Sequence, residues 1–298
     1  MASIKDLKKR IGSVKNTQQT TRAMKMVSAA KLRRAQDAIH HQRPYAKRLR
    51  ELIQVVAEMA TQPVDLSFLQ RERTLKDGEK KRILLVVFTS DRGLCGAFNG
   101  SVIKRLQRWV TENRSNCESI EISFVGRKGY EFLRTKSFGT VGKYYVDVAS
   151  KPTFAHATTL SDDLISAYVS GRADEVHFIF NEFINVVSQR PTVERFLPLE
   201  MATPNPEGST GATHHIVKPD YATVLQQLMA RNFGVQVFRV LLESQAGEHG
   251  ARMSSMENAT KNAGEMIRKL SLQYNKQRQA SITKELLEII SGSESQKS

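Results

Sequence analysis

The sequence predicts an α/β domain inserted between two long terminal helices that pair as an antiparallel coiled coil. Apolar and small residues recur at alternating spacings of three and four near both ends of the chain. Between these ends, strand-like apolar runs alternate with helical patterns. The expected segments are 1–60 for the N-terminal coiled-coil helix, 61–215 for the α/β domain and 216–298 for the C-terminal coiled-coil helix.

The N-terminal segment carries an apolar seam from Ile4 to Ala60. Twelve of the seventeen positions reached in steps of three and four are apolar, and the register holds throughout. Pro44 is the only helix breaker, so a bend or local irregularity is expected there. An ordinary amphipathic helix lying on a core is the alternative, but such helices usually have only three or four turns.

The C-terminal segment, from about Phe238 to Ile290, carries a second seam and no proline. A helix of about fifty residues would be about 75 Å long at 1.5 Å per residue, longer than most single domains are wide. It should therefore project from the globular part and need a partner, which the N-terminal helix supplies. The seam positions are Ala246, His249, Met253, Met256, Thr260, Ala263, Ile267, Leu270, Tyr274, Gln277 and Ser281.

The middle of the chain alternates strand and helix patterns, which predicts a mostly parallel sheet covered by helices. The run Ile83–Phe88 is continuously apolar and suits a strand buried on both faces. Further strands are expected at 120–125, 141–146, 175–180 and, in one or two pieces, 186–196. Helices are expected from 99 to 110, at 127–134, at 160–169 and again from Tyr221. Polar connections are expected at 61–81 and 204–219.

The net charge is +15, and most of it lies in the first fifty residues. Fourteen Lys and Arg stand there against Asp6 and Asp37, a local net charge of +12. A basic helix suits a polyanionic partner, which leaves nucleic acid, an anionic membrane surface and an acidic protein surface open. A basic coiled-coil protein that binds nucleic acid is therefore the alternative function, although no aromatic residues interleave the basic ones for base stacking.

The sequence contains no convincing catalytic or cofactor motif. The loop Ser90–Gly96 follows a strand, but it lacks both the G-x-G-x-x-G and the P-loop spacing of nucleotide sites. A dinucleotide enzyme with helical arms thus remains only a second alternative. Cys95 and Cys117 form no disulfide framework or zinc motif, which favours a reducing compartment. No cofactor and no metal are expected. No run of eighteen apolar residues and no secretory signal is present.

Three separated blocks of sequence together carry a family resemblance. The blocks are Ser13–Gln19 with Ala23–Val27 and Ala30–Arg33, then Asp91–Gly96, then Glu248–Met256 with Tyr274–Leu286. In this order they resemble the γ subunit, or central stalk, of F-type ATP synthases of the bacterial type. The resemblance extends over the whole chain.

The resemblance implies a Rossmann-like α/β domain and a role as the central rotor shaft of a rotary motor. The shaft couples proton-driven rotation of the c-ring to conformational cycling of the catalytic β subunits during ATP synthesis. The chain itself would be non-catalytic. The implied partners are the α3β3 hexamer, the ε subunit and the c-ring, with one copy per complex and no nucleic acid. The implied location is peripheral, on the cytoplasmic face of the bacterial plasma membrane.

The resemblance also implies which residues meet which partner. Contacts with the β subunits fall on two helices and are expected at Met24, Lys25, Glu248, Arg252, Arg278, Gln279 and Thr283. Of these, Arg278, Gln279 and Thr283 would contact the β catch loop. A foot region that meets the c-ring or ε is expected at His215, Lys218 and Asp220.

Overall fold

A computed structural model describes residues 3–59, 80–134, 136, 139–198, 218 and 220–295. The chain divides into two compact units, one of residues 1–29 with 252–298 and the other of residues 30–251. Helices α1 (Ile4–Met59) and α6 (Tyr221–Ser295) each contribute to both units. The expected segment boundaries at 60, 61, 215 and 216 fall outside the described residues, so the division into three segments stays a prediction.

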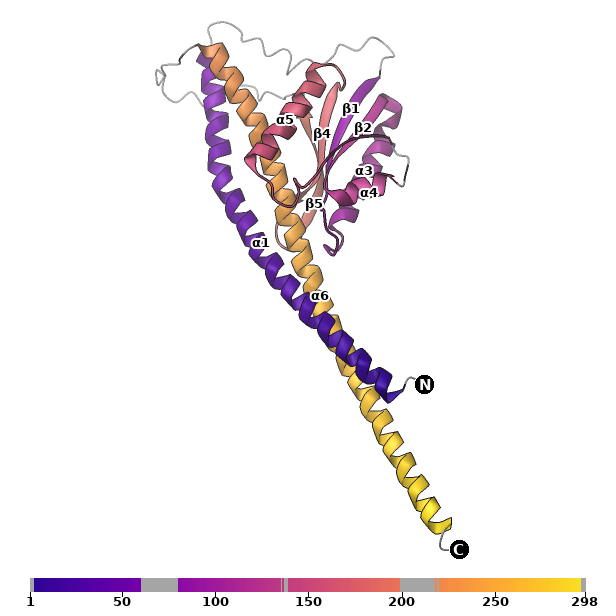
Figure 1. Cartoon of the computed structure of the whole chain (residues 1–298). Coiled ribbons are helices and arrows are strands. Elements are labelled where there is room, and N and C mark those ends of the chain that lie inside the picture. The colour runs from indigo at the N-terminus through magenta and orange to yellow at the C-terminus, as the bar shows by residue number, and fades with distance from the viewer. Residues whose placement is uncertain are drawn as a thin grey trace. The chain divides into compact units, whose positions relative to one another are not determined.

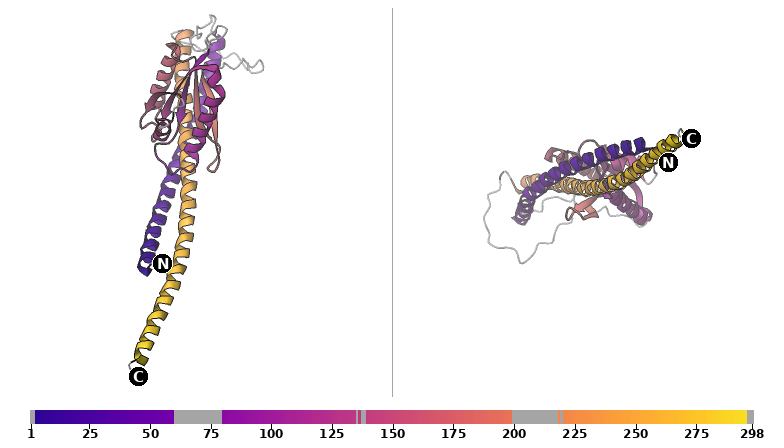
Figure 2. Two further views of the ribbon diagram at one scale, coloured as in Figure 1. Left: turned by 90° about the vertical axis from the view of Figure 1, so that its right-hand side faces the viewer. Right: turned by 90° about the horizontal axis from the view of Figure 1, so that it is seen from below.

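The smaller unit, hereafter the helix-pair unit, consists of the start of α1 and the last part of α6 (Figure 2). Thr21 contacts Thr260 and, further along α1, Lys25 contacts Glu257. Residue numbers therefore rise on one helix as they fall on the other, which is the expected antiparallel pairing. Leu7, Met256 and Ala263 are buried in this unit, as the predicted seam requires.

Both terminal helices are more continuous than their sequence patterns suggested, and α6 is also longer. Helix α1 has 56 residues and runs unbroken through Pro44. Helix α6 has 75 residues, so the helical patterns that begin at Tyr221 and Phe238 belong to one helix (Figure 1).

The larger unit, hereafter the sheet unit, is built on five strands in the order β3-β2-β1-β4-β5 (Figure 1). Strand β1 (Lys81–Phe88) lies between β2 (Cys117–Val125) and β4 (Glu175–Phe183) and is parallel to both. Strand β3 (Thr140–Tyr145) continues the parallel order beyond β2. Strand β5 (Gln189–Leu197) is antiparallel to β4, so the sheet is mostly parallel, as predicted.

Helices cover both faces of this sheet. Leu84, Val86 and Phe88 point to one face and join a core with α5 (Phe154–Val169), with the first part of α6 and with Val56 of α1. Leu85 and Val87 point to the other face and join a core with α3 (Phe98–Asn113) and α4 (Arg127–Arg134). Polar and apolar residues alternate along a strand only when one of its faces meets solvent. Strand β1 is buried on both faces, which explains its continuous apolar run.

The second half of α1 packs against α6 within the sheet unit. The Gln42 side chain donates a hydrogen bond of 2.9 Å to the carbonyl of Val235. The Arg231 guanidinium lies over the Phe154 ring, 4.2 Å from its centroid, and donates to the Tyr45 hydroxyl at 3.0 Å. Stacking of a guanidinium on an aromatic ring adds to the apolar contact between helices.

Among the element boundaries that differ from the predictions, two are explained by local side-chain hydrogen bonds. Helix α5 begins at Phe154 rather than at 160, because the Thr153 side chain accepts a hydrogen bond from the His156 amide and caps the helix. Strand β5 begins at Gln189 rather than at 186, because the Asn185 side chain accepts the amides of Val187 and Ser188 and forms a turn. A short 3-10 helix, Arg114–Asn116, connects α3 to β2.

Candidate functional site

The last part of α6 presents the expected contact residues Arg278, Gln279 and Thr283, and all three are exposed. The Thr283 hydroxyl donates to the carbonyl of Gln279, one turn earlier, at 2.9 Å. Every residue from 282 to 291 is exposed, including large apolar ones. Ile282, Leu286 and Ile289 follow a spacing of four and three, which places them on one face of the helix. This end of α6 thus offers an apolar stripe beside polar groups.

The expected contact residues of α1 lie in the same unit. Met24 is half-buried, and the Lys25 ammonium lies 3.2 Å from the Glu257 carboxylate of α6. This ion pair is partly solvated, so it adds little to stability and leaves Lys25 able to meet another anion. The neighbouring Met26 and Val27 are exposed at 62% and 57%. Both residues belong to the resemblance block Ala23–Val27, but no partner contact was assigned to them from the sequence.

Glu248 and Arg252 were also expected to contact a partner. Each of them is only 8% exposed in this chain. Charged residues are seldom buried unless they are paired. A partner would therefore reach only a small part of either side chain, in contrast to the exposed Arg278 and Gln279.

Two of the three expected foot residues lie in the part of the chain that the structure describes. His215 lies outside the described residues, and Lys218 is exposed. Asp220 caps the start of α6, because its carboxylate accepts the Thr223 amide and the Thr223 hydroxyl, both at 2.8 Å. These hydrogen bonds lower the pKa of Asp220 below its usual value. The sequence carried the signal, an Asp directly before a helical pattern, but it was assigned only to the foot region.

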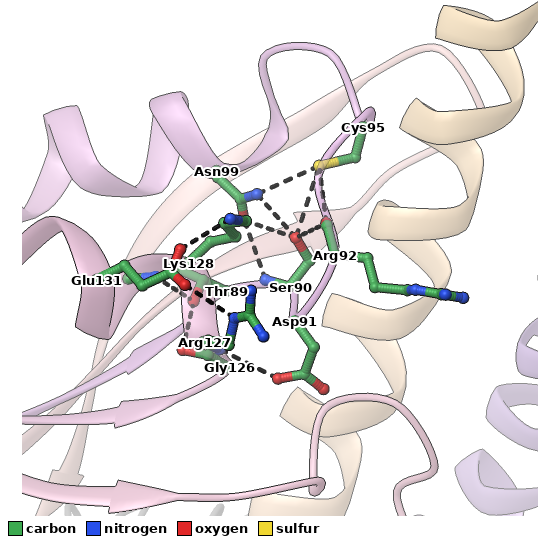
Figure 3. A network of polar contacts seen from close by, with 11 residues as sticks. Thr89, Ser90, Asp91, Arg92, Cys95, Asn99, Gly126, Arg127, Lys128 and Glu131 are labelled. Carbon is green, nitrogen blue, oxygen red and sulfur yellow. Dashed lines mark hydrogen bonds and ion pairs between the residues drawn. The ribbon is translucent and has the colours of Figure 1, made fainter.

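The loop that follows β1 forms a polar network at the carboxyl edge of the sheet (Figure 3). The Asn99 side chain accepts the Ser90 amide at 2.9 Å and donates to the Ser90 hydroxyl at 2.7 Å. It also donates to the Cys95 sulfur at 3.3 Å. The loop turns through positive φ angles at Leu94 (62°) and Gly96 (57°). The polar groups of this loop are thus hydrogen-bonded to one another and to Asn99.

The same loop accepts hydrogen bonds from the first amides of α4. The amino end of a helix beside a parallel sheet is a place where a phosphate can bind. The Arg127 amide donates to the Asp91 carboxylate at 3.0 Å, and the Lys128 amide donates to the Ser90 carbonyl at 3.1 Å. The Gly129 amide donates to the Thr89 hydroxyl at 2.9 Å. The first amides of α4 therefore have partners from this chain.

The strand order changes direction between β1 and β4, which is where α/β sheets of this type usually bind ligands. That position is packed. Asn181 at the end of β4 is fully buried and donates to the Phe98 carbonyl at 2.9 Å, while the Ser101 hydroxyl donates to Asn181 at 3.1 Å. A Cβ atom on Gly247 of α6 would lie 3.1 Å from the Phe98 ring. These contacts disfavour the dinucleotide-enzyme alternative.

A charged cluster lies at the opposite, amino edge of the sheet. The Glu175 carboxylate accepts from His177 at 2.8 Å and from the Lys81 ammonium at 2.6 Å. The hydrogen bond from His177, with the contribution of Lys81, outweighs burial and lowers the pKa of Glu175 to about 2. Burial and the nearby Glu175 raise the pKa of the Cys117 thiol. Such a thiol is a poor nucleophile at neutral pH.

The described residues contain neither a metal-binding cluster nor a membrane-spanning helix. Among residues 3–59, 80–134, 136, 139–198, 218 and 220–295, no group of three or more His, Cys, Asp or Glu could hold a metal ion. In the same part of the chain, no helix has the length and apolar character needed to cross a bilayer.

The family model described as ATP synthase matches residues 3–295. The ATP synthase gamma chain of Trichlorobacter lovleyi is 46% identical over 298 residues, which cover 99% of both chains. The ATP synthase gamma chain of Geobacter sp. strain M21 is 47% identical over 296 residues, again covering 99% of both chains.

Solved structures share the fold at low sequence identity. The rotor of Euglena gracilis mitochondrial ATP synthase gives a TM-score of 0.63 at 17% identity, covering 94% of this chain and 98% of that one. The central stalk and c-ring structure of Tetrahymena thermophila mitochondrial ATP synthase gives 0.55 at 24% identity, covering 80% of this chain and 99% of that one. These matches confirm the predicted fold of long terminal helices around a central α/β domain.

Proposed function

Because this chain belongs to the ATP synthase gamma chain family, we propose that it is the central shaft that couples c-ring rotation to ATP synthesis. The observation that carries the proposal is similarity to curated gamma chains along the whole length of both proteins. The antiparallel helix pair and the exposed end of α6 are the parts of the structure that suit a shaft.

The proposed partners are the α3β3 hexamer, the ε subunit and the c-ring, with one copy of this chain per complex. Similar solved structures include an ATP synthase central stalk with its c-ring and an assembly of OSCP, F1 and c-ring, which supports this set. The +12 net charge of the first fifty residues suits acidic surfaces of the hexamer and does not require nucleic acid. One copy is enough, since a single shaft presents a different face to each surrounding subunit.

We propose that catalysis takes place on the β subunits and that this chain is non-catalytic. An α/β enzyme would bind a nucleotide at the carboxyl edge of the sheet. In this chain that edge is occupied by Asn181, by Phe98 and by the loop that follows β1, which contains Asp91. This packing leaves the sheet unit suited to a structural role rather than to nucleotide chemistry.

The shaft acts by binding three β conformations unequally. A contact changes the equilibrium between conformations only when it is stronger in one of them than in another. The exposed stripe of Ile282, Leu286 and Ile289 suits an apolar sleeve, and Arg278 and Gln279 beside it suit polar groups of a β catch loop. Thr283 completes this proposed contact.

Two further pairs of residues are assigned to β contacts. Met24 and Lys25 lie on α1, where the Lys25 ammonium is already beside Glu257, so an acidic β loop would share this cation. Glu248 and Arg252 are mostly buried, and we propose that they support the surface and offer only their exposed edges to β.

We place the complex on the cytoplasmic face of the bacterial plasma membrane, with this chain peripheral to the bilayer. The bacterial source of the similar gamma chains supports this location. The foot would include His215, Lys218 and Asp220 and would meet the c-ring or ε. Lys218 is exposed and therefore accessible to such a partner.

Affinity purification tests the proposed assembly. A tag is inserted at the exposed Lys136 of the sheet unit, and complexes are purified from detergent-solubilised membranes. We expect three α and three β chains for each copy of this chain, together with ATPase activity. Recovery of the tagged chain alone, or with nucleic acid as its main partner, would reject the assembly and favour the alternative reading of the basic helix.

A further inference from the structure

One acidic residue of the helix-pair unit lies between two lysines that come from different helices. The Glu257 carboxylate of α6 lies 3.2 Å from the Lys25 ammonium of α1 and 3.9 Å from the Lys261 ammonium of α6. Both lysines approach the same carboxylate oxygen, Oε1, so their ammonium groups are close neighbours. These three residues are hereafter the charge triad.

The antiparallel pairing of the two helices brings the charge triad together. On α6, Glu257 and Lys261 are four residues apart, so they lie one turn apart on the same side of the helix. On α1, Lys25 follows one turn after Thr21, whose hydroxyl is 2.8 Å from the hydroxyl of Thr260 on α6. The charge triad is therefore a feature of the paired helices, which neither helix has alone.

The charge triad carries one positive charge in excess and is open to solvent. The side chains of Lys25, Glu257 and Lys261 are 38%, 40% and 70% exposed. The described part of the chain gives neither lysine an ion pair with any other acidic residue. The 3.9 Å contact of Lys261 is too long for a hydrogen bond, so Glu257 leaves the protons of that ammonium available to other acceptors.

A partner carboxylate that approaches the charge triad meets two cations and one anion. Lys25 and Lys261 attract it, while Glu257 repels it and competes with it for the Lys25 ammonium. Exposed ion pairs contribute little to stability, so giving up the existing pair costs little. Glu257 therefore permits an acidic partner to bind but lowers the affinity of that contact.

We infer that Lys25 and Lys261 form a two-cation site for a carboxylate of an acidic partner loop, and that Glu257 limits the strength of that contact. The inference rests on the proposed shaft function, in which the partner is a β subunit. One shaft serves three subunits in turn, so a contact that binds too tightly would hinder exchange among their conformations. Neither Glu257 nor Lys261 was assigned to a partner from the sequence.

Competition between two forms of the full chain for the same hexamer tests the inference. The unchanged chain and one variant, distinguished by isotope content, are mixed with a limiting amount of the α3β3 hexamer. Mass spectrometry measures their ratio in the assembled complex once this ratio is constant. At low salt, uptake of Glu257→Gln should exceed that of the unchanged chain about twofold to fivefold, as expected for removing an exposed charge interaction. At about 1 M salt the preference should disappear, because charges are then screened beyond about 3 Å.

Removing a cation of the site should have the opposite effect. Uptake of Lys261→Gln should fall about twofold to fivefold below that of the unchanged chain, and Lys261→Arg, which keeps the charge, should restore it. Glu265→Gln and Lys269→Gln are the matched controls. Both residues are exposed on α6 in the same unit, and the described part of the chain gives neither of them an ion pair. Each control changes the net charge as its matching variant does, and it should leave the ratio unchanged.

The direction of the Glu257→Gln effect separates the inference from a purely structural role. If Glu257 only held the two helices together, its replacement would weaken assembly, as replacement of Lys25 would. Equal or lower uptake of Glu257→Gln, or equal uptake of Lys261→Gln, in complexes that otherwise assemble normally would overturn the inference and leave the proposed shaft function intact. Failure of the unchanged chain to assemble with the hexamer would instead reject the shaft function, and the inference with it.

Discussion

Replacing Glu175 by Gln should destabilise the sheet unit at neutral pH and much less in acid. Glu175 accepts from His177 and from Lys81, and its pKa is lowered from 4.5 to about 2. A shift of about 2.5 units at about 1.4 kcal/mol per unit corresponds to about 3 kcal/mol. Because Lys81 is partly solvated, we expect about 2 kcal/mol.

The sign of the pH dependence follows from the lowered pKa. The folded protein holds the ionised carboxylate more tightly than the unfolded chain does. The stabilisation is therefore complete above the unfolded pKa of about 4.5 and is lost as pH falls toward the folded value of about 2. Glu175→Gln lacks this titration, so the difference in unfolding free energy between the two proteins should shrink between pH 5 and about pH 2.

Urea unfolding of the full chain at several pH values measures this difference. Near-ultraviolet signals from Trp109, which lies beside His177 with 5.5 Å between ring centroids, report on this part of the sheet unit. Glu112→Gln is the matched control, because Glu112 is exposed and only distantly paired with Arg105. It should change stability by less than about 0.5 kcal/mol at any pH. An equal loss for Glu175→Gln at pH 7 and pH 3 would refute the assignment of the charge cluster.

Three further predictions concern the shaft and the sheet. Arg278→Ala with Thr283→Ala should lower ATP synthesis in membrane vesicles while leaving the helix content unchanged, because both residues are exposed; normal synthesis would remove them from the β contact. Met24→Lys should impair ATP-driven proton pumping more than thermal stability, since it adds a cation beside Lys25 at a half-buried site; unchanged pumping would count against that contact. Gly126→Ala should destabilise the sheet unit by several kcal/mol, because its φ is +103° and a Cβ atom would lie 2.0 Å from the Thr89 carbonyl oxygen; a stable variant in thermal unfolding would contradict this.

Local patterns predicted the elements whose burial is uniform or periodic. The continuous apolar run of β1 and the seams of α1 and α6 were recognisable, because burial on both faces or along one stripe repeats regularly in the sequence. The start of α5 was missed because a single side chain, Thr153, sets it. The seam alone also could not show that α6 begins at Tyr221, since that part packs on the sheet and not only on α1.

The candidate site was less predictable because it depends on contacts between distant segments. Arg278 and Gln279 are exposed near the end of α6, and their contact with the β subunits stays a prediction. The burial of Glu248 and Arg252 could not be predicted, because it depends on how the chain packs around the middle of α6. The pairing of Asp91 with the Arg127 amide joins residues 36 positions apart, and no local pattern identifies it.

Direct observation of rotation tests the central claim. A fluorescent bead is attached to the sheet unit of this chain in complexes with α3β3, whose α and β chains are fixed to a surface. On addition of ATP we predict rotation in one direction, with three equivalent pauses per turn because three β subunits take part in succession. Complexes that contain this chain and hydrolyse ATP while the bead stays still, or moves without a preferred direction, would contradict its assignment as the shaft.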